Sequence, residues 1–359
     1  MTPERLGPPP RLAVSVFNAE EVRAAIGGGA DIVDCEDPRA AIGMFEPRVI
    51  TDIAYAVRRA SERPTPTSAN IGIPQILKGS DVNRAAIRSR LEIEAKAAQV
   101  ALGLAAAMDV GDARPNVLKF EVDGLWRDDV GPFVKAVKRA IRDSRQFQNH
   151  RLIASCLELD REQWEQGRGE ERVVRQLVEL GEFSFDAEGP IDLDHYVPDA
   201  EELRRTMVAA RSSQSRIRLN EPSDPSALGL PESANERLRF WVETLAGAGA
   251  DGIMIDTPIQ AKVSGISLMD TFSLDHLRTF SEHCAFANVE CWLAGSIQPD
   301  DAASLAALPD VDVLMCRGAA SAQVRDPFGR DTSAARSARH ISLERVAALA
   351  GRIKGVTDA

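Results

Sequence analysis

Val117-Leu118-Lys119-Phe120-Glu121 is one of eight short apolar runs in this chain, each of which ends in polar or ionisable residues. We predict that the eight runs are β-strands, at Leu12–Phe17, Asp31–Glu36, Thr67–Gly72, Asn116–Glu121, Leu152–Leu157, Gly252–Thr257, Glu290–Gly295 and Val311–Arg317. Helical patterns lie between them, for example at Ala19–Ile26, Phe133–Ile141, Arg237–Ala246 and Asp301–Leu308. Continuous apolar strands that alternate with amphipathic helices are typical of a parallel sheet covered on both faces. Eight such units predict an α/β protein of the (β/α)8 type, a TIM barrel.

An open dinucleotide-binding sheet is the competing α/β architecture, and the glycines argue against it. No Gly-x-Gly-x-x-Gly follows a strand near the start of the chain, although that fingerprint lets a backbone approach a pyrophosphate. Gly27-Gly28-Gly29 instead precedes a strand, so we interpret it as the end of a helix.

The composition limits the classes of function. The chain has 359 residues, 44% of them apolar, and a net charge of -11. This size suits one barrel domain over residues 1–359 with insertions, and the acidic balance excludes a nucleic-acid binder. Without a signal peptide or a long apolar run, we expect a cytoplasmic protein with no membrane contact. The five cysteines lack Cys-x-x-Cys spacing and the five histidines lack metal-ligand spacing, so we expect no metal and no cofactor.

Two segments are longer than a barrel requires. Residues 80–107, after the third strand, show a polar helical pattern, and residues 161–235, after the fifth, contain several prolines and acidic clusters. Both follow the carboxyl end of a strand, which in a barrel is the face that bears the active site. We expect residues 161–235 to act as a lid or specificity element. A small inserted subdomain is the alternative.

Ionisable side chains gather at the predicted barrel mouth. Because side chains alternate along a strand, Asp34 and Glu36 share a face of the second strand, Lys119 and Glu121 share a face of the fourth, and Asp256 ends the sixth. If these faces point inward, the crowded charge shifts pKa values and can serve proton abstraction and dehydration. An ion-pair network that only closes the barrel is the alternative.

Lys119 is the most informative of these residues. A lysine that loses its proton is a nucleophile toward a carbonyl carbon, and burial in an apolar strand lowers the pKa of an amine. Nearby Glu121, Asp34 and Glu36 would raise that pKa. Our hypothesis is that burial prevails and that Lys119 attacks an aldehyde. A lysine that merely reaches solvent from the strand end is the alternative.

The ends of the last two strands predict a phosphate site. Gly295 and Ser296 follow the seventh strand, and Arg317 and Gly318 follow the eighth. In barrels the loops after these strands often bind phosphate through glycine amides. Ser296 can donate a hydrogen bond, and Arg317 can bind an anion as a fork. Ordinary strand-to-helix turns are the alternative.

Several blocks of sequence, in order along both halves of the chain, carry a family resemblance. They are Leu12-Ala13-Val14-Ser15, Asn18-Ala19-Glu20-Glu21, Gly28-Gly29-Ala30-Asp31-Ile32-Val33-Asp34, Ser68-Ala69-Asn70-Ile71-Gly72, Leu118-Lys119, Ile255-Asp256-Thr257, Leu293-Ala294-Gly295-Ser296 and Arg317-Gly318-Ala319-Ala320. With them the chain resembles the (5-formylfuran-3-yl)methyl phosphate synthases, also named 4-(hydroxymethyl)-2-furancarboxaldehyde-phosphate synthases. The two long segments have no counterpart in that resemblance.

The resemblance implies a (β/α)8 barrel that condenses two glyceraldehyde 3-phosphate molecules into a furan aldehyde phosphate for methanofuran-type cofactors, through a lysine Schiff base. Asp34 matches the family's aspartate and Lys119 its strand-four lysine. Glu36 stands where the family has the lysine usually assigned to the Schiff base, and Gln260 replaces a further lysine, with Lys262 two positions later. A glutamate cannot form an imine, so the family mechanism cannot run unchanged.

We therefore expect a lyase-like enzyme, of the carbon–oxygen and phosphate-eliminating kind, that condenses or dehydrates a small phosphorylated aldehyde. Lys119 would supply the amine, with Lys262 as the alternative nucleophile, while Asp34 and Glu36 act as acid and base and Asp256 orients them. Two alternatives remain: an enzyme that uses no covalent intermediate on another phosphorylated substrate, and a non-catalytic paralogue that binds a partner through residues 161–235. We also expect a homo-oligomer.

Overall fold

The computed structural model describes the chain in separate stretches. They are residues 7–36, 47–61, 63–70, 115–122, 127–143, 150–157, 231, 233–257, 267–323 and 339–355. The segment 80–107, nearly all of 161–235, and the positions Gln260 and Lys262 lie outside these residues. The predictions for a lid, a subdomain, a partner-binding segment and a second lysine nucleophile therefore stay predictions.

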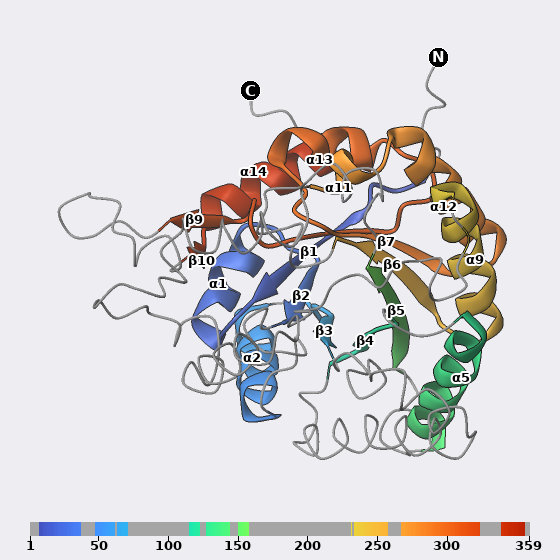
Figure 1. Cartoon of the computed structure of the whole chain (residues 1–359). Helices are drawn as coiled ribbons and strands as arrows, with labels where there is room; N and C mark the ends of the chain where they lie inside the picture. The colour runs from blue at the N-terminus through green and yellow to red at the C-terminus, as the bar shows by residue number, and fades with distance from the viewer. Residues whose placement is uncertain are drawn as a thin grey trace, which may run out of the picture.

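Eight parallel strands form a closed barrel, which confirms the predicted fold (Figure 1). Each strand pairs with the next along the chain, and the eighth pairs with the first. The strands are β1 (Arg11–Val16), β2 (Ile32–Cys35), β3 (Thr67–Asn70), β4 (Val117–Glu121), β5 (Arg151–Leu157), β6 (Gly252–Asp256), β7 (Glu290–Leu293) and β8 (Val313–Cys316). All eight correspond to predicted apolar runs.

The barrel separates two apolar cores, one inside it and one between strands and helices. Val117 belongs to the inner core, whereas Leu118 and Phe120 belong to the outer one. Because side chains alternate along a strand, Lys119 faces the barrel interior with Val117. The same alternation points Asp34 inward two residues after Ile32 of the inner core. The inward orientation assumed from the sequence is therefore confirmed for both charged residues.

Helices pack around the outside of the barrel (Figure 1). They are α1 (Ala19–Gly27), α2 (Pro47–Ala60), α5 (Arg127–Asp143), α9 (Ala234–Gly247), α11 (Leu268–Thr271), α12 (Leu274–Phe286), α13 (Pro299–Ala306) and α14 (Leu343–Lys354). Helix α1 begins where the Asn18 side chain accepts hydrogen bonds from the amides of Glu20 and Glu21, which satisfies donors left open at a helix start. It ends before Gly28, as the glycine run predicted. A Cβ atom on Gly28 would lie 2.5 Å from Cβ of Val346, so glycine lets α14 pack closely against α1.

Four similar contacts fix the register of the strands at the amino-terminal end of the barrel. In each contact, one partner is the residue just before β2, β4, β6 or β8. Its side-chain oxygen accepts a hydrogen bond from a backbone amide near the start of the strand that precedes it in the chain. The same two residues are joined by a backbone hydrogen bond in the opposite sense. The pairs are Asp31 with Leu12 (2.9 Å), Asn116 with Thr67 (3.2 Å), Asp251 with Leu152 (2.8 Å) and Asp312 with Cys291 (2.8 Å).

One element was not predicted from the sequence. Strands β9 (Ser321–Gln323) and β10 (Arg339–Ile341) form a small antiparallel sheet after β8, before α14 begins. Three-residue strands carry no detectable apolar alternation, so the sequence pattern contained no signal for them.

The five cysteines are buried and none of them forms a disulfide. Burial raises the pKa of the Cys316 thiol to about 12. No grouping of three His, Cys, Asp or Glu side chains in the described stretches could hold a metal ion. None of the helices in those stretches is long and apolar enough to cross a membrane.

Candidate active site

A lysine side chain lies between two carboxylates inside the barrel. Lys119 Nζ on β4 donates to Asp34 Oδ2 at 2.8 Å and to Glu36 Oε2 at 2.7 Å, and its third contact is Met315 Sδ at 3.3 Å. An ammonium has three N–H donors, so these contacts use all of them. The structure thus brings together three of the predicted catalytic residues.

The three groups differ in their access to solvent. The side chains of Asp34 and Lys119 are 0% and 1% exposed, whereas that of Glu36 is 17% exposed. Glu36 follows β2 by one residue and lies nearer the carboxyl ends of the strands. Glu36 is therefore the member of the cluster that is most accessible to solvent.

Two hydroxyl groups hold the Asp34 carboxylate in place. Ser15 Oγ of β1 donates to Oδ2 at 3.0 Å, and Ser68 Oγ of β3 donates to Oδ1. Strands β1 and β3, which flank β2, and strand β4, which carries Lys119, therefore all contact this carboxylate. Such a fully hydrogen-bonded buried group is fixed in orientation.

Burial and charge act in opposite directions on the two buried groups. Burial raises the pKa of Asp34 from 3.8 to about 6, although the Lys119 ammonium opposes this. Burial alone would lower the pKa of Lys119, but the charges and hydrogen bonds of Asp34 and Glu36 outweigh it and raise that pKa above its ordinary value. The direction of this shift argues against the hypothesis that burial prevails at Lys119. A raised pKa favours the ammonium form, which is not a nucleophile.

Asp256 is the other predicted catalytic residue within the described stretches. Asp256, at the end of β6, is 4% exposed and accepts from the amide of Thr257 at 2.7 Å. Among the described residues it is not a hydrogen-bond partner of Lys119, whose three partners are given above. Its predicted role in orienting the acid and base stays a prediction, as does any role of Lys262.

The predicted phosphate turn after β7 has an unusual backbone. Gly295 has a φ of +107° and Ser296 a φ of +51°, and a positive φ is uncommon for a non-glycine residue. A Cβ atom on Gly295 would lie 2.8 Å from Oγ1 and 2.9 Å from N of Thr257. The turn after β7 is therefore pressed against the end of β6, and only glycine fits there.

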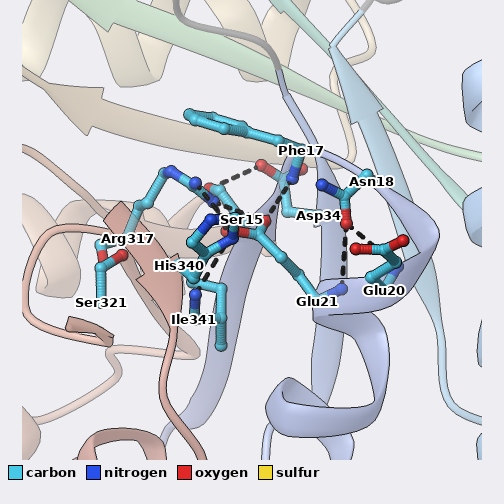
Figure 2. A network of polar contacts seen from close by, with 10 residues as sticks. All are labelled: Ser15, Phe17, Asn18, Glu20, Glu21, Asp34, Arg317, Ser321, His340 and Ile341. Atoms are coloured by element: carbon cyan, nitrogen blue, oxygen red, sulfur yellow. Dashed lines mark hydrogen bonds and ion pairs between the residues drawn. The ribbon is translucent and has the colours of Figure 1, made fainter. Parts of the chain in front are cut away.

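Arg317, at the end of β8, contacts a carboxylate that the sequence did not single out (Figure 2). Its Nη1 and Nη2 atoms donate to the two carboxylate oxygens of Glu21 at 3.0 and 3.1 Å, and Nη1 also donates to the carbonyl of Ser15 at 2.8 Å. The guanidinium carbon lies 3.0 Å from the centroid of the Phe17 ring. The role of Arg317 in phosphate binding stays a prediction, and it must be reconciled with an ion pair that already engages both terminal nitrogens.

Glu21 joins segments that are distant in the sequence. Besides Arg317, it accepts from the amide of Phe17 at 2.6 Å and from that of Ile341 at 3.3 Å, and its side chain is 3% exposed. One carboxylate of α1 thus connects β1, the end of β8 and β10. A glutamate on the buried face of α1, beside Val22 and Ala25, was the available sequence signal.

Ser15 links this second ion pair to the lysine cluster. Its carbonyl accepts from Arg317 while its hydroxyl donates to Asp34 (Figure 2). The Glu21–Arg317 pair therefore helps to fix the strand that presents a hydroxyl to the buried aspartate.

The family of the chain can be stated from its sequence. A family model described as 4-HFC-P synthase matches residues 12–120 and 232–334, more than half of the chain. This chain belongs to the 4-HFC-P synthase family. The resemblance seen in the sequence blocks is thereby confirmed. The first matched segment includes residues 80–107, which we expected to lack a counterpart in the 4-HFC-P synthase family, whereas most of 161–235 lies outside the match.

The solved structures found by comparison are only distantly similar to this 4-HFC-P synthase family member. A putative lyase/mutase from Burkholderia cenocepacia J2315 is 12% identical with a TM-score of 0.44, over 88% of this chain and 78% of that one. Thiamine phosphate pyrophosphorylase from Pyrococcus furiosus is 11% identical with a TM-score of 0.42, over 97% of each chain. Monomers made from the dimeric phosphoribosylanthranilate isomerase of Thermotoga maritima are 8% identical with a TM-score of 0.41, over 96% of this chain and 99% of that one. A comparison with curated proteins found no match.

Proposed function

We propose that this member of the 4-HFC-P synthase family is a lyase-type enzyme that moves a proton on a small phosphorylated aldehyde without a covalent lysine intermediate. The observation that carries the proposal is the contact of Lys119 Nζ with both Asp34 and Glu36, at 2.8 and 2.7 Å, inside a barrel whose mouth Glu36 reaches. The family membership supports the substrate class.

Glu36 is the group that touches the substrate, because its side chain is the exposed member of the cluster. Its carboxylate accepts a proton from the carbon next to the aldehyde, and the C–H electron pair forms an enolate. General base catalysis of this kind requires a carboxylate within hydrogen-bond reach of the proton. In glyceraldehyde 3-phosphate the enolate then expels the oxygen substituent of the next carbon, so that the C–O bond breaks and inorganic phosphate leaves. Alternatively the enolate carbon adds to the carbonyl carbon of a second aldehyde, and the new alkoxide takes the proton from Glu36, which is condensation.

Lys119 stabilises the negative charge that develops on the aldehyde oxygen. One of its N–H groups points at the Met315 thioether, 3.3 Å away, and a thioether sulfur is a weak acceptor. A substrate oxygen that replaces the sulfur gains a charge-assisted hydrogen bond, which is stronger than the one it displaces. Asp34 retains the ammonium in position while Glu36 takes the proton.

A Schiff base on Lys119 is disfavoured because imine formation requires the neutral amine. Both carboxylates would have to be neutralised or moved before this lysine loses its proton. Borohydride reduction in the presence of glyceraldehyde 3-phosphate tests the point directly. We expect no adduct on Lys119, and a reduced adduct there would replace the proposed mechanism by a covalent one.

Hydrogen exchange tests the proton transfer itself. The full chain is incubated with glyceraldehyde 3-phosphate in deuterated buffer, and deuterium at the carbon next to the aldehyde is followed by NMR. We expect exchange above the enzyme-free rate, lost in Glu36→Gln and retained in Glu243→Gln, whose side chain is 63% exposed on α9. Exchange that is unchanged in Glu36→Gln contradicts the assignment. An enzyme-free rate in every variant favours the non-catalytic paralogue.

A further inference from the structure

A buried hydroxyl without a hydrogen-bond partner lies at the end of β6. Thr257 is 0% exposed, and its Oγ1 atom has no partner in the part of the chain that the structure describes. A buried hydroxyl that makes no hydrogen bond costs free energy, so its presence requires an explanation. A hydroxyl that donates to a bound ligand provides one.

The turn after β7 faces this hydroxyl. The Cβ position of Gly295 lies 2.8 Å from Thr257 Oγ1, so the hydroxyl lies directly beside the turn. The Thr257 amide is already used, because it donates to the carboxylate of Asp256. Only the hydroxyl of Thr257 is therefore available on this side.

Backbone donors accompany the hydroxyl. Within the described residues, the amides of Gly295 and Ser296 donate to no acceptor, whereas the next amide before them, that of Ala294, donates to the carbonyl of Ile255. The Gly295 carbonyl is satisfied, since it accepts from the amide of Leu268 at 2.7 Å. The strained turn thus keeps its acceptors bonded and leaves two adjacent donors open. Successive open amides beside a hydroxyl are a common way of binding an anion.

We infer that Thr257 Oγ1 and the amides of Gly295 and Ser296 form the subsite for a phosphate monoester. The inference rests on the proposed function, because the monoester is the phosphate end of the same substrate. All three donors are neutral N–H or O–H groups, so the proposal gives Arg317 no part in this subsite. Thr257 was not among the residues predicted from the sequence to bind phosphate.

The position of the subsite suits a small phosphorylated aldehyde. In a closed barrel of eight strands, β6 and β7 lie across the mouth from β2 and β3. The phosphate end would lie on one side of the mouth, and the aldehyde would reach Glu36 on the other. The carboxyl ends of the strands, where both groups lie, form the face on which TIM barrels build their active sites.

Phosphate titration of three proteins tests the subsite without any turnover. Inorganic phosphate is titrated into wild type, Thr257→Val and Thr257→Ser by calorimetry at constant ionic strength. Because a hydrogen bond to a charged group contributes about 1.5–3 kcal/mol, we expect Thr257→Val to bind at least tenfold more weakly, and Thr257→Ser to stay within about threefold of wild type. The Tm of Thr257→Val in phosphate-free buffer should equal or exceed that of wild type, since the variant buries no unpaired hydroxyl.

Each outcome decides for or against the subsite. Equal phosphate affinity in wild type and Thr257→Val overturns it, as does the absence of phosphate binding to wild type. A lower Tm in Thr257→Val with unchanged affinity would make Thr257 a packing residue. Phosphate binding that depends on Thr257 but occurs without deuterium exchange leaves the subsite standing and refutes the proposed reaction.

Discussion

Replacing Lys119 by methionine should destabilise the fold strongly, and in a way that depends on pH. The change leaves Asp34 ionised and 0% exposed without its cation, and breaking a buried pair by removing one partner costs about 3–5 kcal/mol. Even with Lys119 present, the pKa of Asp34 is raised from 3.8 to about 6. Ionising Asp34 in the folded protein therefore costs about 3 kcal/mol more than ionising it in water. Without the ammonium that pKa rises further.

The sign of the pH dependence follows from this order of pKa values. At pH 8 the variant must bury a carboxylate, so the loss of unfolding free energy is greatest. At pH 5 Asp34 is protonated in the folded variant, so the loss is smaller. Adding Asp34→Asn to Lys119→Met removes the buried charge and should recover part of the loss at pH 8.

Urea unfolding followed by circular dichroism at pH 5 and pH 8 measures these differences. Lys354→Met is the matched control, because Lys354 also pairs with an aspartate but its side chain is 36% exposed. Removal of such a pair should cost less than about 1 kcal/mol. A loss below that value in Lys119→Met at pH 8, or a loss that grows toward pH 5, would refute the buried ammonium.

Three further predictions concern other parts of the barrel. Arg317→Ala should lower the unfolding free energy by about 3 kcal/mol or more, because it leaves the buried Glu21 carboxylate without its cation. Arg352→Ala is the control, from a pair whose carboxylate is 91% exposed, and should change the unfolding free energy by less than about 1 kcal/mol. Equal effects in urea unfolding would contradict the burial argument. The contribution of Asp34 to wild-type stability should fall by roughly 3 kcal/mol as the pH rises from below 3.8 to above 6, because its raised pKa makes the folded state bind its proton more tightly. Urea unfolding across this pH range should therefore show a shallower fall for Asp34→Asn than for wild type, and an equal fall in the two proteins would assign the slope to another group. Gly295→Ala should lower the Tm sharply because of its positive φ and the close Cβ contact, while Gly247→Ala, with no atom within 4 Å of the new Cβ, should not; matching shifts would mean that the turn can relax.

The barrel and the inward position of its charged residues could be predicted because they depend on local pattern. Buried parallel strands are continuous apolar runs, and strict alternation then places Lys119 and Asp34 on the inner face. The protonation state of Lys119 could not be predicted in this way. It depends on the balance between burial and two carboxylates at 2.7 and 2.8 Å. Those distances depend on how β2 and β4, which are not neighbours in the barrel, are placed in space.

The Glu21–Arg317 pair shows a second limit. The two residues are 296 positions apart, and neither the helical pattern of α1 nor the end of β8 specifies the other as its partner. Sequence spacing therefore suggested an anion site at Arg317, where the folded chain places a glutamate. The orphan hydroxyl of Thr257 was missed for the same reason, since a lack of partners is a property of the packed structure.

The four Asp or Asn contacts at the amino-terminal end occur at equivalent positions in β1–β4 and in β5–β8, so the two halves of the barrel share the same arrangement of strands. Gly29 and Gly249 have φ values of +94° and +93°, and each precedes by two residues the aspartate of such a contact, Asp31 or Asp251, so β1–α1–β2 repeats as β5–α9–β6. The residue three positions after each member of these contact pairs has its side chain inside the barrel, which gives one such residue per strand. In the first half these are Ser15, Asp34, Asn70 and Lys119, and in the second half they are Ser155, Met254, Ala294 and Met315. In this layer the two charged side chains therefore belong to the first half, while the second half contributes one hydroxyl and three apolar side chains, of which Met315 contacts the ammonium. Transferring the lysine and aspartate to the equivalent second-half positions would test whether the two halves, alike in backbone, are also exchangeable in function.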